Sequence, residues 1–139
     1  MRSLGWARDC LLGGTGSDSL KGGPGNDYVL GGPIGCNRPA EQERPAASDV
    51  VKGGPGDDVV DGYAGADFIS GGDGDDFLSD GENHRGATDV LSGGAGDDIL
   101  FPANDPAGVD QVSCGKGRDE VFADRADIVP GDCEKVRRS

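Results

Sequence analysis

The sequence predicts an all-β solenoid, because a nine-residue period runs along almost the whole chain. Units that follow the pattern GGxGxDxUx, in which U is aliphatic, open at Gly13, Gly22, Gly53, Gly62, Gly71 and Gly93. A fixed short period of this kind indicates stacked structural units. It also accounts for a composition of 27 glycines and 34% hydrophobic residues, which without a period would indicate disorder.

Six further units extend the repeat over residues 4–139 as one domain. Weaker units open at Leu4, Cys114 and Ala123, and units with insertions open at Gly31, Asp80 and Pro102. We expect these insertions near 33–47, 82–87 and 104–108, and a C-terminal cap from about 123. The sixth position is always aspartate, at Asp9, Asp18, Asp27, Asp49, Asp58, Asp67, Asp76, Asp89, Asp98, Asp110 and Asp119, with Asp127 in the shortened last unit.

Each position of the repeat has an expected physical role. Glycines at the first, second and fourth positions are expected to permit positive φ angles and to let backbone carbonyls converge. The last three residues predict a short strand that gains stability only by stacking on its neighbours. The eighth position is aliphatic in all twelve units and is expected to point inward as a thin core ladder.

The charge of the chain indicates which partners it can bind. Lys and Arg number 13 against 26 Asp and Glu, which gives a formal net charge of −13. This charge repels nucleic acid, and no apolar run is long enough to span a bilayer. Recurring carboxylates together with turn carbonyls form an oxygen-rich environment of the kind that Ca²⁺ prefers. Cations are therefore the expected partners.

These motifs resemble the RTX, or hemolysin-type, calcium-binding nonapeptide-repeat family over nearly the whole chain. The resemblance implies a right-handed parallel β-roll in which six residues form a turn, three form a strand, and two units make one coil. It also implies that calcium ions lie between turns on the same edge, held by aspartate carboxylates and turn carbonyls. About three to six ions are expected.

If two units make a coil, alternate units lie on opposite edges. We call the edge formed by the units at Leu4, Gly22, Gly53, Gly71, Gly93 and Cys114 the first edge, and the other, which contains all three insertions, the second edge. The stronger sites are expected on the uninterrupted first edge, although Arg118 weakens its last turn. The candidate ligands are Asp27, Asp58, Asp76, Asp98 and Asp119, then Asp18 and Asp67 of the second edge, with Gly22, Gly25, Gly53, Gly56, Gly71, Gly74, Gly93 and Gly96.

Calcium is expected to be needed for folding. A ladder of small aliphatic side chains is a poor core for a chain of this length, and stacked aspartates repel one another. Calcium removes that repulsion and binds only the folded form, so we expect folding and binding to be coupled. The alternative is that the aspartates only form turns and keep the surface hydrated, which the number of copies disfavours.

The four cysteines indicate disulfides in an oxidising, extracellular compartment, because no CxxC spacing typical of a zinc site is present. If the register continues past Pro130, Cys114 and Cys133 lie one coil apart on one edge and are expected to pair. Cys10 and Cys36 would then form the second pair, with free thiols as the alternative. No secretory signal is visible at the start of the sequence.

The sequence does not predict an enzyme. His84 is the only histidine, and no nucleophile motif accompanies it. The leading hypothesis is a secreted calcium-binding protein with a structural or adhesive role. The alternatives are a non-catalytic C-terminal folding or secretion module of a larger protease or lipase, and a calcium-independent interaction solenoid. Phe68, Phe77, Val59 and Ile99 are expected to form an outward apolar stripe suited to an unidentified protein or cell-surface partner.

Overall fold

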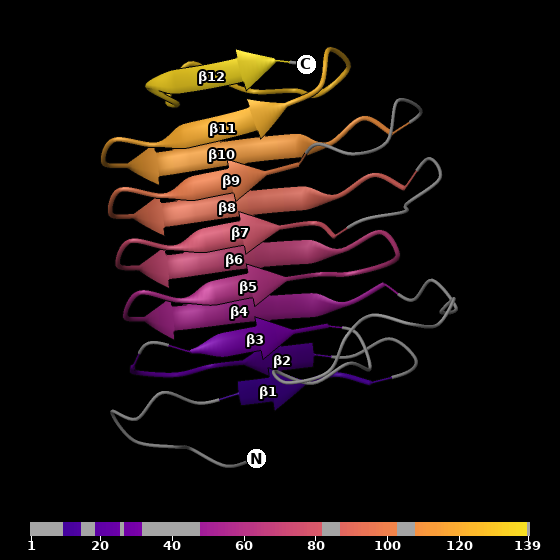
Figure 1. The fold of residues 1–139 in the computed structure, drawn as a ribbon, viewed down its shortest axis with the longest axis vertical. Coiled ribbons are helices and arrows are strands. Elements are labelled where there is room, and N and C mark those ends of the chain that lie inside the picture. The colour runs from indigo at the N-terminus through magenta and orange to yellow at the C-terminus, as the bar shows by residue number, and fades with distance from the viewer. Residues whose placement is uncertain are drawn as a thin grey trace.

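The computed structural model describes residues 10–14, 19–25, 27–31, 48–81, 87–102 and 108–138. These residues form an all-β structure without a helix, stacked along one long axis (Figure 1). None of them, accordingly, forms a helix able to cross a membrane. The strands are β1 (Cys10–Leu12), β2 (Ser19–Lys21), β3 (Tyr28–Leu30), β4 (Val50–Pro55), β5 (Val59–Asp61), β6 (Phe68–Asp73), β7 (Phe77–Ser79), β8 (Val90–Ala95), β9 (Ile99–Phe101), β10 (Gln111–Lys116), β11 (Glu120–Ala123) and β12 (Lys135–Arg138).

The strands form two parallel sheets that share the chain in alternation. One sheet has the order β1-β3-β5-β7-β9-β11-β12, and the other has the order β10-β8-β6-β4-β2. Consecutive strands up to β11 therefore belong to opposite sheets, and strands two apart in sequence pair with each other. This confirms the predicted parallel β-solenoid with two repeats in each coil. In Figure 1 the stack rises from β1 at the bottom to β12 at the top.

The eighth position of the repeat forms the core, as the sequence predicts. In one sheet Val60 pairs with Leu78, and Leu78 with Leu100. In the other sheet Val51 pairs with Ile69, in the same register. All of these side chains are fully buried. Among the described residues, the core is a narrow column of eighth-position side chains, namely Val29, Val51, Val60, Ile69, Leu78, Leu91, Leu100, Val112 and Val121, joined by the first-position Cys114 and Ala123.

The glycines of the turn fall into two classes, which corrects one expectation. The second-position Gly54 has a φ of 131°, which favours glycine. The first-position Gly53 is not among the positive-φ residues, so its conformation is not the reason for glycine there. A Cβ on Gly53 would instead collide with Oδ2 of Asp58 and lie 2.7 Å from the carbonyl oxygen of Gly71. The first position is therefore glycine because two oxygens occupy the space.

The expected apolar stripe is divided between two faces. Phe77 and Ile99 lie on β7 and β9 of the seven-stranded sheet, whereas Phe68 lies on β6 of the other sheet. The prediction of one stripe that includes Phe68 is wrong, because successive repeats face opposite sides of the solenoid. The aromatic contacts continue instead along the seven-stranded sheet, where the rings of Phe101 and Phe122 stack with centroids 4.4 Å apart.

Candidate metal centre

The strand order places the turns of the repeat in two rows. The turns 22–27, 53–58, 71–76, 93–98 and 114–119 each lead from the five-stranded sheet to the seven-stranded sheet. They stack along one side of the solenoid, as expected for the first edge. Turns in the opposite direction form the second edge. The expected insertions lie almost wholly outside the described residues, and so does Asp18.

The sixth-position aspartates of the first edge are joined by a ladder of hydrogen bonds. The backbone N–H of Asp58 donates to Oδ1 of Asp76 at 2.8 Å, and that of Asp76 donates to Oδ1 of Asp98 at 2.9 Å. The same bond joins Asp27 to Asp58 at 2.6 Å and Asp98 to Asp119 at 2.9 Å. All five side chains are buried. One carboxylate oxygen of each residue from Asp58 to Asp119 is therefore committed to the neighbouring coil.

In four of these carboxylates, the second oxygen has no donor among the described residues. Oδ2 of Asp58, Asp76, Asp98 and Asp119 is buried without a hydrogen-bond partner in the described part of the chain. In the turns at Asp58 and Asp76, this oxygen lies in the space beside the first-position glycine. A buried carboxylate oxygen without a donor is strongly unfavourable. A cation would satisfy it, so these residues fit a calcium ion.

Burial raises the pKa of these carboxyl groups. It raises the pKa of Asp76 to about 7 and those of Asp58 and Asp98 to about 6, against the opposing effect of the backbone N–H bonds. Neighbouring carboxylates of the row raise them further; for Asp76 these include Asp98 and Asp58. The negative charge of the row is thus costly near neutral pH, and a divalent cation would relieve that cost.

Backbone carbonyl oxygens also lie close to the glycines of the stacked turns. The carbonyl oxygen of Gly56 lies against Gly74 in the following turn, and that of Gly71 lies against Gly53 in the preceding turn. Each of these carbonyls therefore lies against the other turn of the stacked pair 53–58 and 71–76. Carbonyl and carboxylate oxygens are the ligands of Ca²⁺. The eight glycines named from the sequence all lie in these first-edge turns.

The second edge carries the same ladder in spite of its insertions. Asp67 donates its N–H to Oδ1 of Asp89 at 2.6 Å, and Asp89 donates to Oδ1 of Asp110 at 2.8 Å. Asp49 and Asp127 extend the ladder at its two ends. Oδ2 of Asp67 is buried without a partner among the described residues, and burial raises the pKa of Asp67 to about 7. Asp49, Asp89, Asp110 and Asp127 were not selected from the sequence as ligands, although they share the sixth position.

The fifth position forms an outer ladder that sequence reasoning missed. The N–H of Asp75 donates to Oδ1 of Asp57 at 2.9 Å, and that of Asp97 donates to Oδ1 of Asp75 at 2.8 Å. Arg118 continues the ladder by donating its N–H to Asp97 at 2.9 Å. The signal was an aspartate at this position in three consecutive first-edge units. Unlike the sixth-position side chains, these aspartates are exposed.

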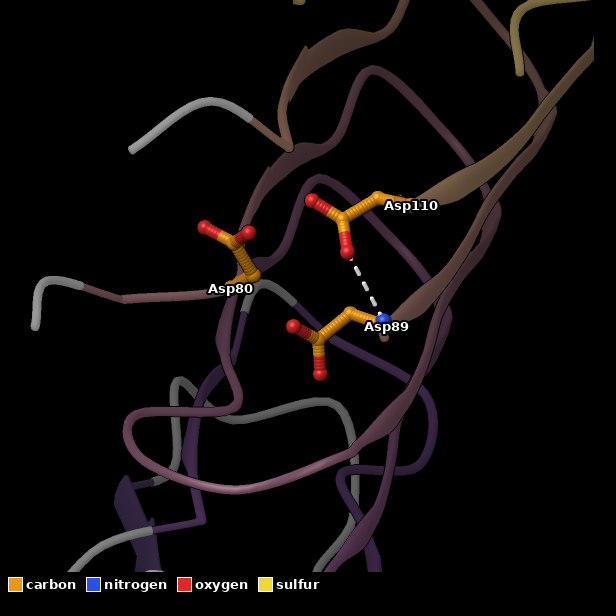
Figure 2. Close-up of side chains that lie close together, drawn as sticks. All are labelled: Asp80, Asp89 and Asp110. Carbon is orange, nitrogen blue, oxygen red and sulfur yellow. Dashed lines mark hydrogen bonds between the residues drawn. The ribbon is translucent and has the colours of Figure 1, made fainter. Parts of the chain in front are cut away.

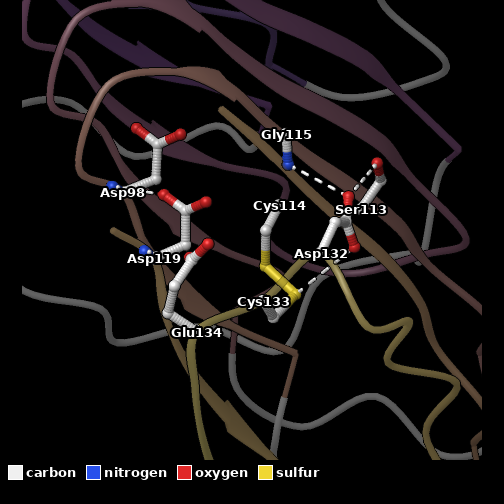
Figure 3. Close-up of a disulfide and its surroundings, with 8 residues drawn as sticks. All are labelled: Asp98, Ser113, Cys114, Gly115, Asp119, Asp132, Cys133 and Glu134. Atoms are coloured by element: carbon white, nitrogen blue, oxygen red, sulfur yellow. Dashed lines mark hydrogen bonds between the residues drawn. A yellow bond between two sulfur atoms is a disulfide. The ribbon is translucent and has the colours of Figure 1, made fainter. Parts of the chain in front are cut away.

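The C-terminal segment reproduces the contacts of a further repeat with different residues (Figure 3). Glu134 Oε2 accepts the N–H of Asp119 at 2.9 Å, where an aspartate of the next coil would act. Asp132 Oδ2 accepts the N–H of Gly115 at 3.1 Å. Between them Cys133 forms the expected disulfide with Cys114, with Cα atoms 5.2 Å apart. These three consecutive residues therefore cap the first edge.

The other predicted disulfide is only partly described. Cys10 is disulfide-bonded. Its expected partner, Cys36, lies outside the described residues.

Comparison with protein families gives a direct match to this architecture. The model of the RTX calcium-binding nonapeptide repeat matches in four copies, over residues 5–33, 46–78 and 86–104, which together exceed half of the chain. The chain belongs to this family and is a calcium-binding repeat protein. The resemblance inferred from the residue pattern is thereby confirmed. Searches among curated proteins and among solved structures found no match.

Proposed function

We propose that this protein is a secreted calcium-binding β-roll that folds when it binds calcium and that serves a structural or adhesive role without catalysis of its own. The observation that carries the proposal is the row of buried Oδ2 atoms at Asp58, Asp76, Asp98 and Asp119, none of which has a hydrogen-bond donor in the described structure. Such a row is unfavourable as bare carboxylates and suited to Ca²⁺.

The proposed ligands follow from this row. The first-edge carboxylates Asp27, Asp58, Asp76, Asp98 and Asp119 hold the stronger ions, and Asp67 and Asp18 contribute on the second edge. Carbonyls of the turn glycines complete the coordination. About three to six ions bind in total, and residues 4–139 act as one unit.

Folding and binding are proposed to be a single event. The core is one aliphatic side chain wide at each repeat, and the carboxyl groups with raised pKa oppose folding near neutral pH. Because calcium binds the folded form and not the unfolded chain, its binding energy adds to folding stability. The chain thus stays largely unfolded where calcium is scarce and folds at extracellular concentrations of about 0.1 to 1 mM.

The disulfide supports the secreted location. Cys114 and Cys133 are bonded in the C-terminal cap, and such bonds persist in oxidising compartments outside the cell. Calcium is abundant in the same places. Both conditions for the fold are therefore met after export.

A calcium titration tests this proposal on the purified chain. Calorimetry counts the bound ions, and circular dichroism follows strand content in the same samples. We expect strand content to rise with the number of ions bound. A strand-rich spectrum in excess chelator, unchanged on adding calcium, would overturn calcium-coupled folding and favour a calcium-independent interaction solenoid. If the full-length transcript encoded an upstream catalytic domain, the role would be that of an accessory module of a larger enzyme.

A further inference from the structure

Three carboxylates converge on the second edge in an arrangement that the repeat does not contain. Asp80, Asp89 and Asp110 are all buried, and each offers a carboxylate oxygen within 4.8 Å of the others. Asp80 follows β7, Asp89 precedes β8 and Asp110 precedes β10. Figure 2 shows the three side chains directed toward a common space. Asp89 and Asp110 are sixth-position residues, but Asp80 occupies a first position, where the six best repeats have glycine.

A side chain at the first position is excluded from the turns that open at Gly53 and Gly71. At Gly53 and Gly71 a Cβ would collide with Oδ2 of the sixth-position aspartate of the same turn. The unit of Asp80 is longer than the consensus, because its sixth-position residue is Asp89. Gly81 keeps the positive φ of the second position, at 90°. The longer unit thus has a carboxylate at a position where the turns at Gly53 and Gly71 have no room for a side chain.

Asp80 contributes a carboxylate oxygen that no group among the described residues satisfies. Its side chain is 4% exposed, and its Oδ1 is buried without a hydrogen-bond partner in the described structure. No basic side chain of the described residues forms an ion pair with Asp80. Within the cluster, Oδ1 of Asp110 accepts the N–H of Asp89 at 2.8 Å. Burial, and after it the negative charges of Asp110 and Asp89, raise the pKa of Asp80 to about 9.

We propose that Asp80, Asp89 and Asp110 form a calcium site distinct from the sites between regular turns, in which Asp80 supplies a third side-chain carboxylate. This inference rests on the proposed function, since it assumes that calcium enters the fold. A larger number of charged ligands raises calcium affinity. The site is therefore the tightest of the second edge, although the sequence predicted that insertions weaken that edge.

The position of the site gives it a structural role. Asp80 and Asp89 lie on either side of the expected insertion near 82–87, and Asp110 follows the one near 104–108. An ion held by all three residues ties together both ends of the first insertion and the point where the second rejoins the solenoid. The calcium site thus fixes the bases of two adjacent inserted segments on one edge.

The test compares the full chain with two variants at Asp80 and a matched control. Asp80→Asn removes the charge, and Asp80→Gly restores the consensus residue of the first position, so at least one variant should fold. Asp73→Asn is the control, because it removes one carboxylate from an exposed side chain of a first-edge turn. Circular dichroism in saturating calcium verifies the fold, and equilibrium dialysis against ⁴⁵Ca²⁺ counts the ions.

We expect both Asp80 variants to bind one calcium ion fewer per chain than the wild type and the control. If they bind the same number of ions with unchanged affinity, the cluster merely shares protons and the inference is wrong, while the proposed function stands. If the wild type itself binds no calcium, the proposed function fails, and this inference fails with it. Loss of one ion from the Asp73→Asn control as well would show a general effect of charge and would also overturn the inference.

Discussion

The backbone N–H of Asp58 donates a hydrogen bond to Oδ1 of Asp76, eighteen residues later in the chain, at 2.8 Å. This bond links two coils of the solenoid, and Oδ2 of Asp76 stays buried with no donor from the described part of the chain. A single side chain thus has two functions: one oxygen holds the stack together, and the other is available to a cation. The two functions can be separated experimentally.

Asp76→Asn should have opposite effects with and without calcium. The amide oxygen of asparagine can still accept the N–H of Asp58, but the buried negative charge is lost. In calcium-stripped protein we expect strand content equal to or greater than that of the wild type. In calcium we expect affinity to fall about tenfold, which corresponds to about 1.4 kcal/mol. Circular dichroism along a calcium titration measures both effects.

Asp75→Asn is the matched control for that variant. It changes the charge by the same amount in the same turn, but the side chain of Asp75 is exposed. Its calcium affinity should stay close to that of the wild type. Equal losses in the two variants would mean that overall charge, and not a ligand, determines affinity.

The metal-free protein should gain strand structure in mild acid. The pKa values of Asp58, Asp76 and Asp98 in the fold are about 6 to 7, above the value of about 3.9 for unfolded aspartate. The fold therefore binds more protons than the unfolded chain, and the stability from this source is lost as pH rises from about 4 through 7. We expect more strand at about pH 5 than at about pH 8 by circular dichroism of calcium-stripped protein.

Calcium should reverse this dependence on pH. Because the ion needs ionised carboxylates, its affinity should fall as pH drops below about 7. The same measurement in saturating calcium should therefore show no gain of strand in acid. A metal-free protein that loses strand on acidification would contradict the burial of these groups.

Gly53→Ala should destabilise the fold although Gly53 has no positive φ. The added methyl group would meet Oδ2 of Asp58 and the carbonyl oxygen of Gly71. We expect a loss of about 2 kcal/mol in calcium, typical of overpacking, together with weaker binding because Asp58 is displaced. Denaturant unfolding in calcium provides the measurement. Gly131→Ala is the control, since its added carbon has no atom within 4 Å, and it should be neutral.

Loss of the Cys114–Cys133 disulfide should loosen the C-terminal cap. The bond spans 19 residues, and a loop of that length corresponds to about 3 kcal/mol of stabilisation in the chain-entropy model. The double variant Cys114→Ala, Cys133→Ala should lower stability in calcium by up to this amount, measured by urea unfolding. An unchanged midpoint would show that Asp132 and Glu134 alone hold the cap in place.

The repeat pattern predicted most of the fold because every nine-residue unit forms one turn followed by one strand. It placed Leu78 and its equivalents in the core, and it paired Cys114 with Cys133. It could not predict the role of Glu134, because this residue replaces an aspartate outside the period. The cluster at Asp80 was also missed, since its members belong to units whose spacing is interrupted. The role of residues that depart from the period becomes visible only in the structure, where the coils are stacked and the neighbours of each residue are known.

The capping residues have a consequence for how such a molecule can vary in length. Glu134 and Asp132 offer the last turn the acceptors that another turn would have offered, so the termination does not depend on how many coils precede it. Duplication or deletion of a pair of repeats in the interior leaves every remaining neighbour contact of the same type. The gene can therefore lengthen or shorten the rod in steps of one coil while its closing end stays the same.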